Sequence, residues 1–147
     1  MDIKKLSLKK FIEDSEIVEQ EFDFAGYAGI AEIYAMSIVL FRKGNSQDVC
    51  AMAFYNIVHR ELISLANNII SNIGLGVKFG SSMKKIKRKY GEPFSMYETY
   101  IDTVDCNYLV KPDLFICFGV TNNRLAYLQI VNDYEMAQDI ADARREY

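Results

Sequence analysis

The 147-residue chain contains no tryptophan, only two prolines, a single histidine and three cysteines. Because proline is so scarce and half of the residues are apolar, the composition argues against disorder and predicts one globular domain spanning residues 1–147. A chain of this length buries roughly two-thirds of its unfolded surface, so we expect it to be stable without a metal or a disulfide.

The cysteines Cys50, Cys106 and Cys117 have no CxxC spacing and lie in apolar, strand-like stretches. We therefore expect reduced core residues in a cytoplasmic protein rather than a zinc site, which the single histidine also disfavours.

His59 stands in the sequence HREL, where a pair with Glu61 would permit acid–base chemistry. No second histidine or nucleophile accompanies it. The sequence thus favours a non-catalytic protein without a cofactor, in which His59 is structural or exposed.

Long apolar runs are also missing: no stretch of 18 apolar residues occurs, and Glu32 interrupts the closest approach, residues 25–41. The N-terminal sequence MDIKKLSLKKF has lysines but neither an apolar h-region nor a small-residue cleavage site. We therefore expect neither a membrane span nor an export signal.

Hydrophobic periodicity predicts the α+β class: a single domain with an antiparallel sheet and short helices packed on one side. For residues 1–73 it predicts a helix followed by strands that include a β-hairpin. The expected elements are a helix over 6–14 and strands over 17–24, 30–42 and 48–58. Residues 59–73 favour a further helix, although Asn67 and Asn68 would also permit a break and a short strand.

Residues 74–147 are predicted to form a helix, a three-stranded meander and a C-terminal helix. The meander strands are expected over 94–110, 114–120 and 125–131, with an irregularity near 103–106 in the first. Asp133 is expected to cap the last helix, which runs to about Arg145.

The most sharply bounded segment is Gly80–Pro93, GSSMKKIKRKYGEP. Ser82, or equally Ser81, suits an N-cap, and Gly91 and Pro93 suit the end of a helix. Between them, one apolar stripe recurs at helical spacing: Met83, Ile86 and Tyr90. The pattern predicts a helix of about two turns, which is too short to be stable alone and must dock through that stripe.

The spacing of Gly80, Ser82, Ile86, Tyr90, Gly91 and Pro93 resembles the signature G-x-[ST]-x3-[VI]-x3-[hydrophobic]-G-x-P of BamE/SmpA-like domains, whose fold is similar to that of the β-lactamase inhibitory protein. In that group a short helix precedes an antiparallel meander, as residues 80–132 are expected to do. The resemblance implies a scaffold that presents a sheet face or loops to another protein, and it carries no catalytic residues across. BamE-type proteins are exported lipoproteins, and this sequence shows neither a signal peptide nor an acylated cysteine, so an outer-membrane role is not implied.

Two charged runs are candidates for binding. The first places six positive charges and no negative ones between residues 78 and 89: Lys78, Lys84, Lys85, Lys87, Arg88 and Lys89. This basic patch would attract the phosphates of nucleic acid. The net charge of −3 and the acidic pI instead favour a solvated helix face or a docking patch for an acidic protein.

The second run places six carboxylates within residues 13–23. Alternation predicts that Glu19, Glu21 and Asp23 share one face of a strand, where like charges cost stability. One explanation is a solvated edge strand protected from aggregation. The other is a surface, formed by Glu16, Glu19, Glu21 and Asp23, that meets a basic partner.

Tyrosines in the second half of the chain are also typical of interfaces, since they combine an apolar body with a polar tip. They are Tyr97, Tyr100, Tyr108, Tyr127 and Tyr134.

We expect a protein-binding domain, specifically a cytoplasmic immunity protein that inhibits a bacterial toxin by covering its basic cleft with the acidic strand. The alternative is an accessory domain that binds nucleic acid or a small ligand through the basic patch.

Overall fold

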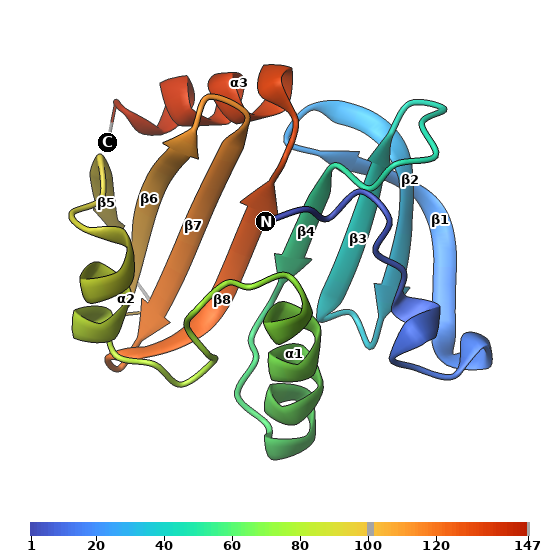
Figure 1. Cartoon of the computed structure of the whole chain (residues 1–147), viewed down its shortest axis with the longest axis horizontal. Coiled ribbons are helices and arrows are strands. Elements are labelled where there is room, and N and C mark those ends of the chain that lie inside the picture. Colours follow the sequence, from blue (N-terminus) through green and yellow to red (C-terminus); the bar gives the residue numbers. More distant parts are fainter. Residues whose placement is uncertain (100–101, 147) are drawn as a thin grey trace.

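The computed structural model describes residues 1–99 and 102–146, which form one eight-stranded antiparallel sheet and three α-helices (Figure 1). The strands are β1 (Ile17–Phe24), β2 (Tyr27–Tyr34), β3 (Ile38–Lys43), β4 (Ala51–Phe54), β5 (Ser95–Glu98), β6 (Thr103–Lys111), β7 (Leu114–Thr121) and β8 (Arg124–Val131). The helices are α1 (Arg60–Asn72), α2 (Met83–Tyr90) and α3 (Tyr134–Arg144). The α+β class and the antiparallel sheet are therefore confirmed.

The strand order is β1-β2-β3-β4-β8-β7-β6-β5, so two four-stranded meanders meet side by side where β4 pairs with β8. This arrangement corrects the predicted strand counts in both halves. The expected strand over 30–42 is two strands, β2 and β3, joined by a turn in which Ala35 and Met36 have φ of 52° and 57°. Neither glycine nor asparagine marks that turn, so the sequence reads as one continuous strand.

The expected strand over 94–110 is likewise the hairpin of β5 and β6. The irregularity predicted near 103–106 is not found there, because residues 103–109 pair regularly with β7 and the register of β6 shifts only between Leu109 and Lys111. Residues 100 and 101 of that stretch lie outside the described residues. The strand expected over 48–58 shrinks to β4, because the chain turns at Asn56, which has φ of 53°.

The N-terminal segment is two short 3-10 turns, Leu8–Lys10 and Asp14–Glu16, rather than the expected helix over 6–14. The backbone N–H of Leu8 donates to the Glu32 carboxylate on β2 at 3.3 Å. Leu8 itself is fully buried. Docking of this segment on the sheet therefore overrides its helical periodicity.

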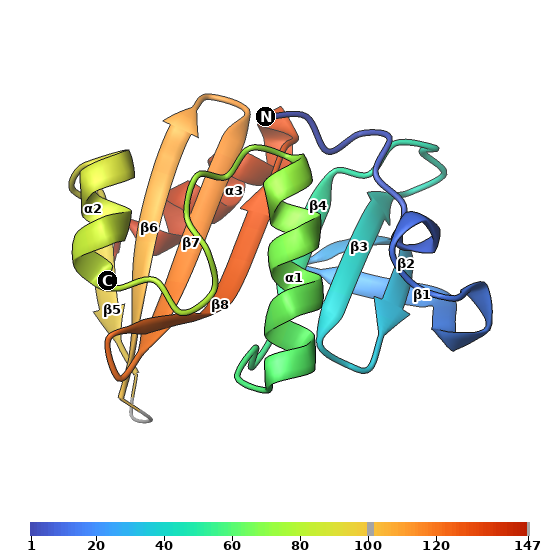
Figure 2. The ribbon, with the colours of Figure 1, turned by 60° about the horizontal axis from the view of Figure 1, so that its bottom comes forward.

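Both faces of the sheet are covered, and we name them by the alternating side chains of β7. Leu114, Ile116, Phe118 and Val120 lie on face A, and Phe115 and Cys117 lie on face B. α1, α2 and the N-terminal segment pack on face A, whereas α3 packs on face B through Met136, Ala137, Ile140 and Ala141. Figure 2 shows α1 and α2 in front of the sheet and α3 behind it.

The expectation that the helices pack on one side is thus wrong in one respect, since α3 lies opposite the other two. The physical reason is the composition of β7, whose two alternating sets of side chains are both apolar and need cover on both faces.

The helix α2 has the boundaries that the sequence predicts. The Ser82 hydroxyl accepts from the N–H of Lys85 at 3.3 Å, and Gly91 ends the helix with φ of 81°. Ile86 is fully buried on face A, and Met83 and Tyr90 pack around it.

The Ser82→Ala variant is expected to lose about 1 kcal/mol of unfolding free energy, because the first turn then lacks its capping acceptor. Urea denaturation followed by circular dichroism measures this loss. Ser64→Ala, at an exposed position inside α1, serves as the control and is expected to be neutral or slightly stabilising. Equal stability of the Ser82→Ala variant and the wild type would contradict the capping role.

Candidate functional site

The strand β1 is an edge of the sheet and pairs only with β2 among the described residues. Its side chains of Glu19, Glu21 and Asp23 are exposed and lie on the face A side, in the alternation that the sequence predicts. None of the three has an ion-pair partner within residues 1–99 and 102–146. Asp23 accepts one hydrogen bond, from the N–H of Gly26 at 2.9 Å.

A fourth carboxylate lies beside this row. Glu32 on β2 is directly opposite Glu19 and is only 2% exposed. Its Oε2 atom lies 2.7 Å from Nη2 of Arg42, and its Oε1 atom accepts from the Leu8 N–H and, at 3.4 Å, from the Ser7 hydroxyl. Glu32 is therefore neutralised and structural, in contrast to the exposed carboxylates of β1.

Two adjoining hollows follow this row of carboxylates on face A. The first, of about 470 Å³, is lined by Glu19, Glu32 and Arg42, and the second, of about 570 Å³, by Glu21 and Asp23. Both share the walls Ile30, Gly44 and Asn45. We call the two hollows together the acidic groove. Sequence reasoning missed Glu32 and Arg42 because β2 and β3 were read as a single strand.

Glu16 does not belong to the acidic groove. It ends the second 3-10 turn, before β1, and lines a separate hollow near Phe11, Tyr34 and Leu65. The structure thus brings together three of the four predicted acidic residues.

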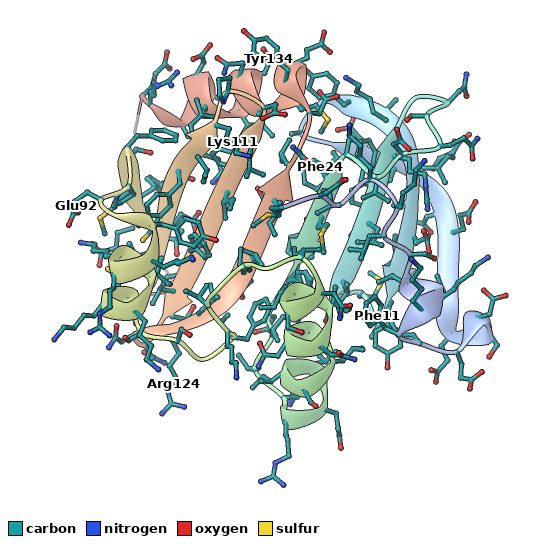
Figure 3. The ribbon with its side chains drawn as sticks, in the orientation of Figure 1. Phe11, Phe24, Glu92, Lys111, Arg124 and Tyr134 are labelled. Atoms are coloured by element: carbon teal, nitrogen blue, oxygen red, sulfur yellow. The ribbon has the colours of Figure 1, made fainter. Side chains whose placement is uncertain are left out.

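The basic patch lies at the other end of the sheet, because α2 stands beside β5 and β6 whereas β1 forms the opposite edge (Figures 1 and 2). Five of its residues are exposed: Lys78, Lys84, Lys85, Arg88 and Lys89. Lys87 is partly buried and pairs with Glu92 at 3.4 Å, and Glu92 projects from the outer edge of the molecule in Figure 3.

The structure adds no support for chemistry at the histidine or the cysteines. His59 is exposed at the N-cap of α1 and makes no capping hydrogen bond through its side chain. The three cysteines are free and buried, as the sequence predicts. Burial raises the pKa of Cys106 to about 11 and that of Cys117 to about 12, which keeps both thiols protonated at neutral pH.

The described part of the chain offers neither a metal site nor a membrane-spanning helix. No group of three or more His, Cys, Asp or Glu side chains there is placed to hold a metal ion. None of the described helices is both long and apolar enough to cross a membrane.

A polar pit on face B was not foreseen from the sequence. It is formed around the Arg144 guanidinium, whose Nη1 donates to Asn107 Oδ1 at 3.0 Å and to Cys117 Sγ at 3.3 Å, and whose Nη2 donates to Gln129 Oε1 at 3.3 Å. The Asp105 carboxylate lies 4.0 Å from Nη1. Burial raises the pKa of Asp105, and the nearby guanidinium opposes that rise.

The five residues Asp105, Asn107, Cys117, Gln129 and Arg144, which we call the polar pit, come from β6, β7, β8 and α3. In the sequence, Arg144 reads as an ordinary basic residue at a helix C-terminus. The one available signal was the polar alternation Thr103, Asp105, Asn107 on β6, beside the irregularity expected there.

The predicted tyrosine cluster is dispersed. Tyr108 is buried and donates to the Gly91 carbonyl at 2.8 Å, and Tyr127 lines a hollow beside the polar pit. Tyr97 is 45% exposed, and Tyr134 is 63% exposed on the outer side of α3 (Figure 3). Tyr100 lies outside the described residues.

No family model matches this chain, and neither a curated protein nor a solved structure matches it. The resemblance of residues 80–132 to BamE/SmpA-like domains therefore stays a prediction, and the proposals below depend on the geometry alone.

Proposed function

We propose that this chain is a non-catalytic protein-binding domain whose acidic groove covers a basic surface of a partner protein. More narrowly, we propose an immunity or inhibitor protein of the bacterial cytoplasm that neutralises a toxin acting on nucleic acid. Such a toxin needs a basic cleft to hold phosphates, and an acidic surface is steered into that cleft by long-range attraction.

The observation that carries this proposal is the row of three exposed carboxylates on β1, none of which has an ion-pair partner among the described residues. The two cations that line the same hollow, Lys9 and Arg42, pair instead with Asp14 and Glu32. Glu19, Glu21 and Asp23 repel one another along one face of β1, so the row costs stability unless it serves a purpose. The same repulsion opposes pairing of β1 with β1 of a second copy, because like charges would then lie opposite each other. A basic partner relieves the repulsion and gains the attraction.

The free edge of β1 adds a second means of contact. Eight residues, Ile17–Phe24, have a strand neighbour on one side only among the described residues. Backbone groups on the outer side are available to an extended segment of a partner, as in strand addition.

Charge reversal tests the proposal. Once a partner has been captured from extracts of the native cells and purified, the Glu19→Lys/Glu21→Lys variant is expected to associate about 10-fold or more slowly at low ionic strength. Its association rate should also depend less on salt, since the steering charge is lost. The measurement is surface plasmon resonance across a salt series, together with the partner's nuclease activity, which the wild-type chain is expected to abolish.

The control variant is Glu98→Lys/Glu146→Lys, which makes the same change in net charge at exposed positions away from β1. If both double variants associate equally fast, or if the partner's activity survives saturation with the wild-type chain, the proposal is wrong.

A second candidate function, binding of nucleic acid or a phosphorylated small ligand, is favoured by the five exposed cations of the basic patch. Filter binding of RNA and DNA across a salt series distinguishes the two functions. Salt-dependent binding that Lys84→Glu/Arg88→Glu removes would support the second candidate, and its absence would eliminate it.

A further inference from the structure

The polar pit contains two opposite charges, Asp105 and Arg144, that form a long ion pair without a hydrogen bond between them. All three acceptors that Arg144 reaches are neutral: the Asn107 and Gln129 amide oxygens and the Cys117 sulfur. The Asp105 carboxylate is 4.0 Å away, beyond hydrogen-bond distance. Both side chains are mostly buried, with 18% of Arg144 and 27% of Asp105 exposed. Such charges favour additional partners of opposite sign.

A hollow of about 210 Å³ opens onto these charges. Its lining includes Asp105, Gln129 and Arg144, with Tyr55 and Tyr127 as aromatic walls. This volume is below the roughly 300–1,000 Å³ of pockets for drug-sized ligands, so the occupant is small.

Two details indicate that the hollow is built into the fold. Gly119 on β7 lets two lining residues pack closely over it, since a Cβ there would lie 2.6 Å from Tyr127 Cβ and 3.3 Å from Asp105 Oδ1. Thr99, another lining residue, has a buried hydroxyl without a hydrogen-bond partner among the described residues. An unpaired buried hydroxyl costs free energy that a polar ligand would recover.

A second hollow, of about 250 Å³, meets the first at Tyr55, Gln129 and Arg144 and continues over Phe22 and Phe24. The pit therefore combines a cation, an anion and adjoining aromatic surface. A ligand with one charge would match only half of it, because a carboxylate alone would be repelled by Asp105 and an amine alone by Arg144.

We propose that the polar pit binds a free α-amino acid, whose carboxylate accepts hydrogen bonds from Arg144 and whose ammonium group donates to Asp105. The two charged groups of an α-amino acid are bonded to the same carbon, Cα, which suits a guanidinium and a carboxylate 4.0 Å apart. Its side chain would lie against Tyr55 or Tyr127. This site is on face B and does not depend on the function proposed above, although its adjoining hollow reaches Asp23 at one end of the acidic groove.

The test titrates the purified 147-residue chain with each of the standard amino acids, by calorimetry and NMR at neutral pH. The titration runs up to about 10 mM, where a Kd of ~1 mM is nearly saturated. At least one amino acid is expected to bind saturably. It should bind about 10-fold more tightly than the matched carboxylic acid without the amino group and the matched amine without the carboxylate.

Asp105→Asn and Arg144→Gln are each expected to weaken that binding about 10-fold or more. Arg145→Gln, which alters the neighbouring exposed arginine, is the matched control and should bind as the wild type does. Because Arg144 also attaches α3 to the sheet, its variant is interpreted only if its circular dichroism is native, and Asp105→Asn provides the independent test.

Three outcomes would overturn the proposal: no saturable binding of any amino acid, equal binding of the one-charge analogues, or unchanged binding by Asp105→Asn. Guanine and guanosine are included as probes, because a base edge also pairs with an Arg–Asp combination. Tighter binding of either than of every amino acid would reassign the pit to a nucleobase.

Discussion

Phe118→Ala is expected to lower the free energy of unfolding by about 3–5 kcal/mol, the range for removing a fully buried aromatic ring. Phe118 is 0% exposed in the middle of β7 on face A. Its ring centroid lies 5.1 Å from that of Tyr90 and 5.7 Å from that of Tyr108. The ring thus joins the sheet to α2, and truncation leaves a cavity that these two tyrosines also line.

The consequence extends beyond Phe118 itself. Tyr90 donates to the Leu75 carbonyl at 2.5 Å, and Tyr108 donates to the Gly91 carbonyl at 2.8 Å. Both hydroxyls hold backbone on either side of α2, so loss of the ring between them loosens the whole helix. Since domains are stable by only about 5–15 kcal/mol, the variant should be close to unfolding at 37 °C.

Thermal and urea denaturation measure this effect. Tyr134→Ala removes an aromatic ring that is 63% exposed on α3 and is expected to change stability by no more than about 0.5 kcal/mol. If Phe118→Ala were no more destabilising than Tyr134→Ala, the described packing of α2 on β7 would be wrong.

The second large effect is expected from Arg42→Met, at about 3 kcal/mol. This variant leaves the Glu32 carboxylate buried without its cation, and breaking one side of a buried ion pair costs about 3–5 kcal/mol. We expect the lower end of this range of destabilisation because the pair is partly open to solvent: the Arg42 side chain is 22% exposed, whereas that of Glu32 is 3% exposed. The N-terminal segment should loosen as well, since Glu32 also accepts from the Leu8 N–H.

A double variant distinguishes the loss of the Glu32–Arg42 ion pair from the loss of the packing of the Arg42 side chain. Glu32→Gln/Arg42→Met removes the stranded charge and is expected to be more stable than Arg42→Met alone. Lys43→Met is the surface control: Lys43 pairs with Asp133 at 3.1 Å, but about a third of its side chain is exposed, so we expect at most about 1 kcal/mol. Equal losses for Arg42→Met and Lys43→Met would mean that burial of Glu32 is not what matters.

Much of the fold was predictable where the signal is local. α2 and α3 have the predicted caps, Ser82 and Asp133, and β1 has the predicted bounds because charged and apolar residues alternate along it. The two missed hairpins failed for a physical reason. The turn between β2 and β3 places Ala35 and Met36 at positive φ, a conformation that these residues rarely adopt and that the surrounding strand pairing must enforce.

The candidate sites were also predictable only where the signal is local in the sequence. Alternation alone placed Glu19, Glu21 and Asp23 on one face, but the acidic groove also needs Glu32 and Arg42, whose positions depend on the unforeseen hairpin. The polar pit was beyond reach, because Asp105, Gln129 and Arg144 are far apart in sequence and meet only when β6, β8 and α3 assemble.

The two meanders meet where β4 pairs with β8, and we call this pairing the seam. The seam sets the order in which the chain can fold. Within each meander every strand pairs with a neighbour in sequence, so those contacts have low contact order and form quickly. The pairing of β4 with β8 joins Phe54 to Leu128 and must wait for the remote strand. Until then the first meander presents an unpaired apolar edge, Ala51–Phe54, in which all four residues are buried in the finished sheet. The period before this seam closes is therefore when a nascent chain is most exposed to aggregation and most in need of a chaperone.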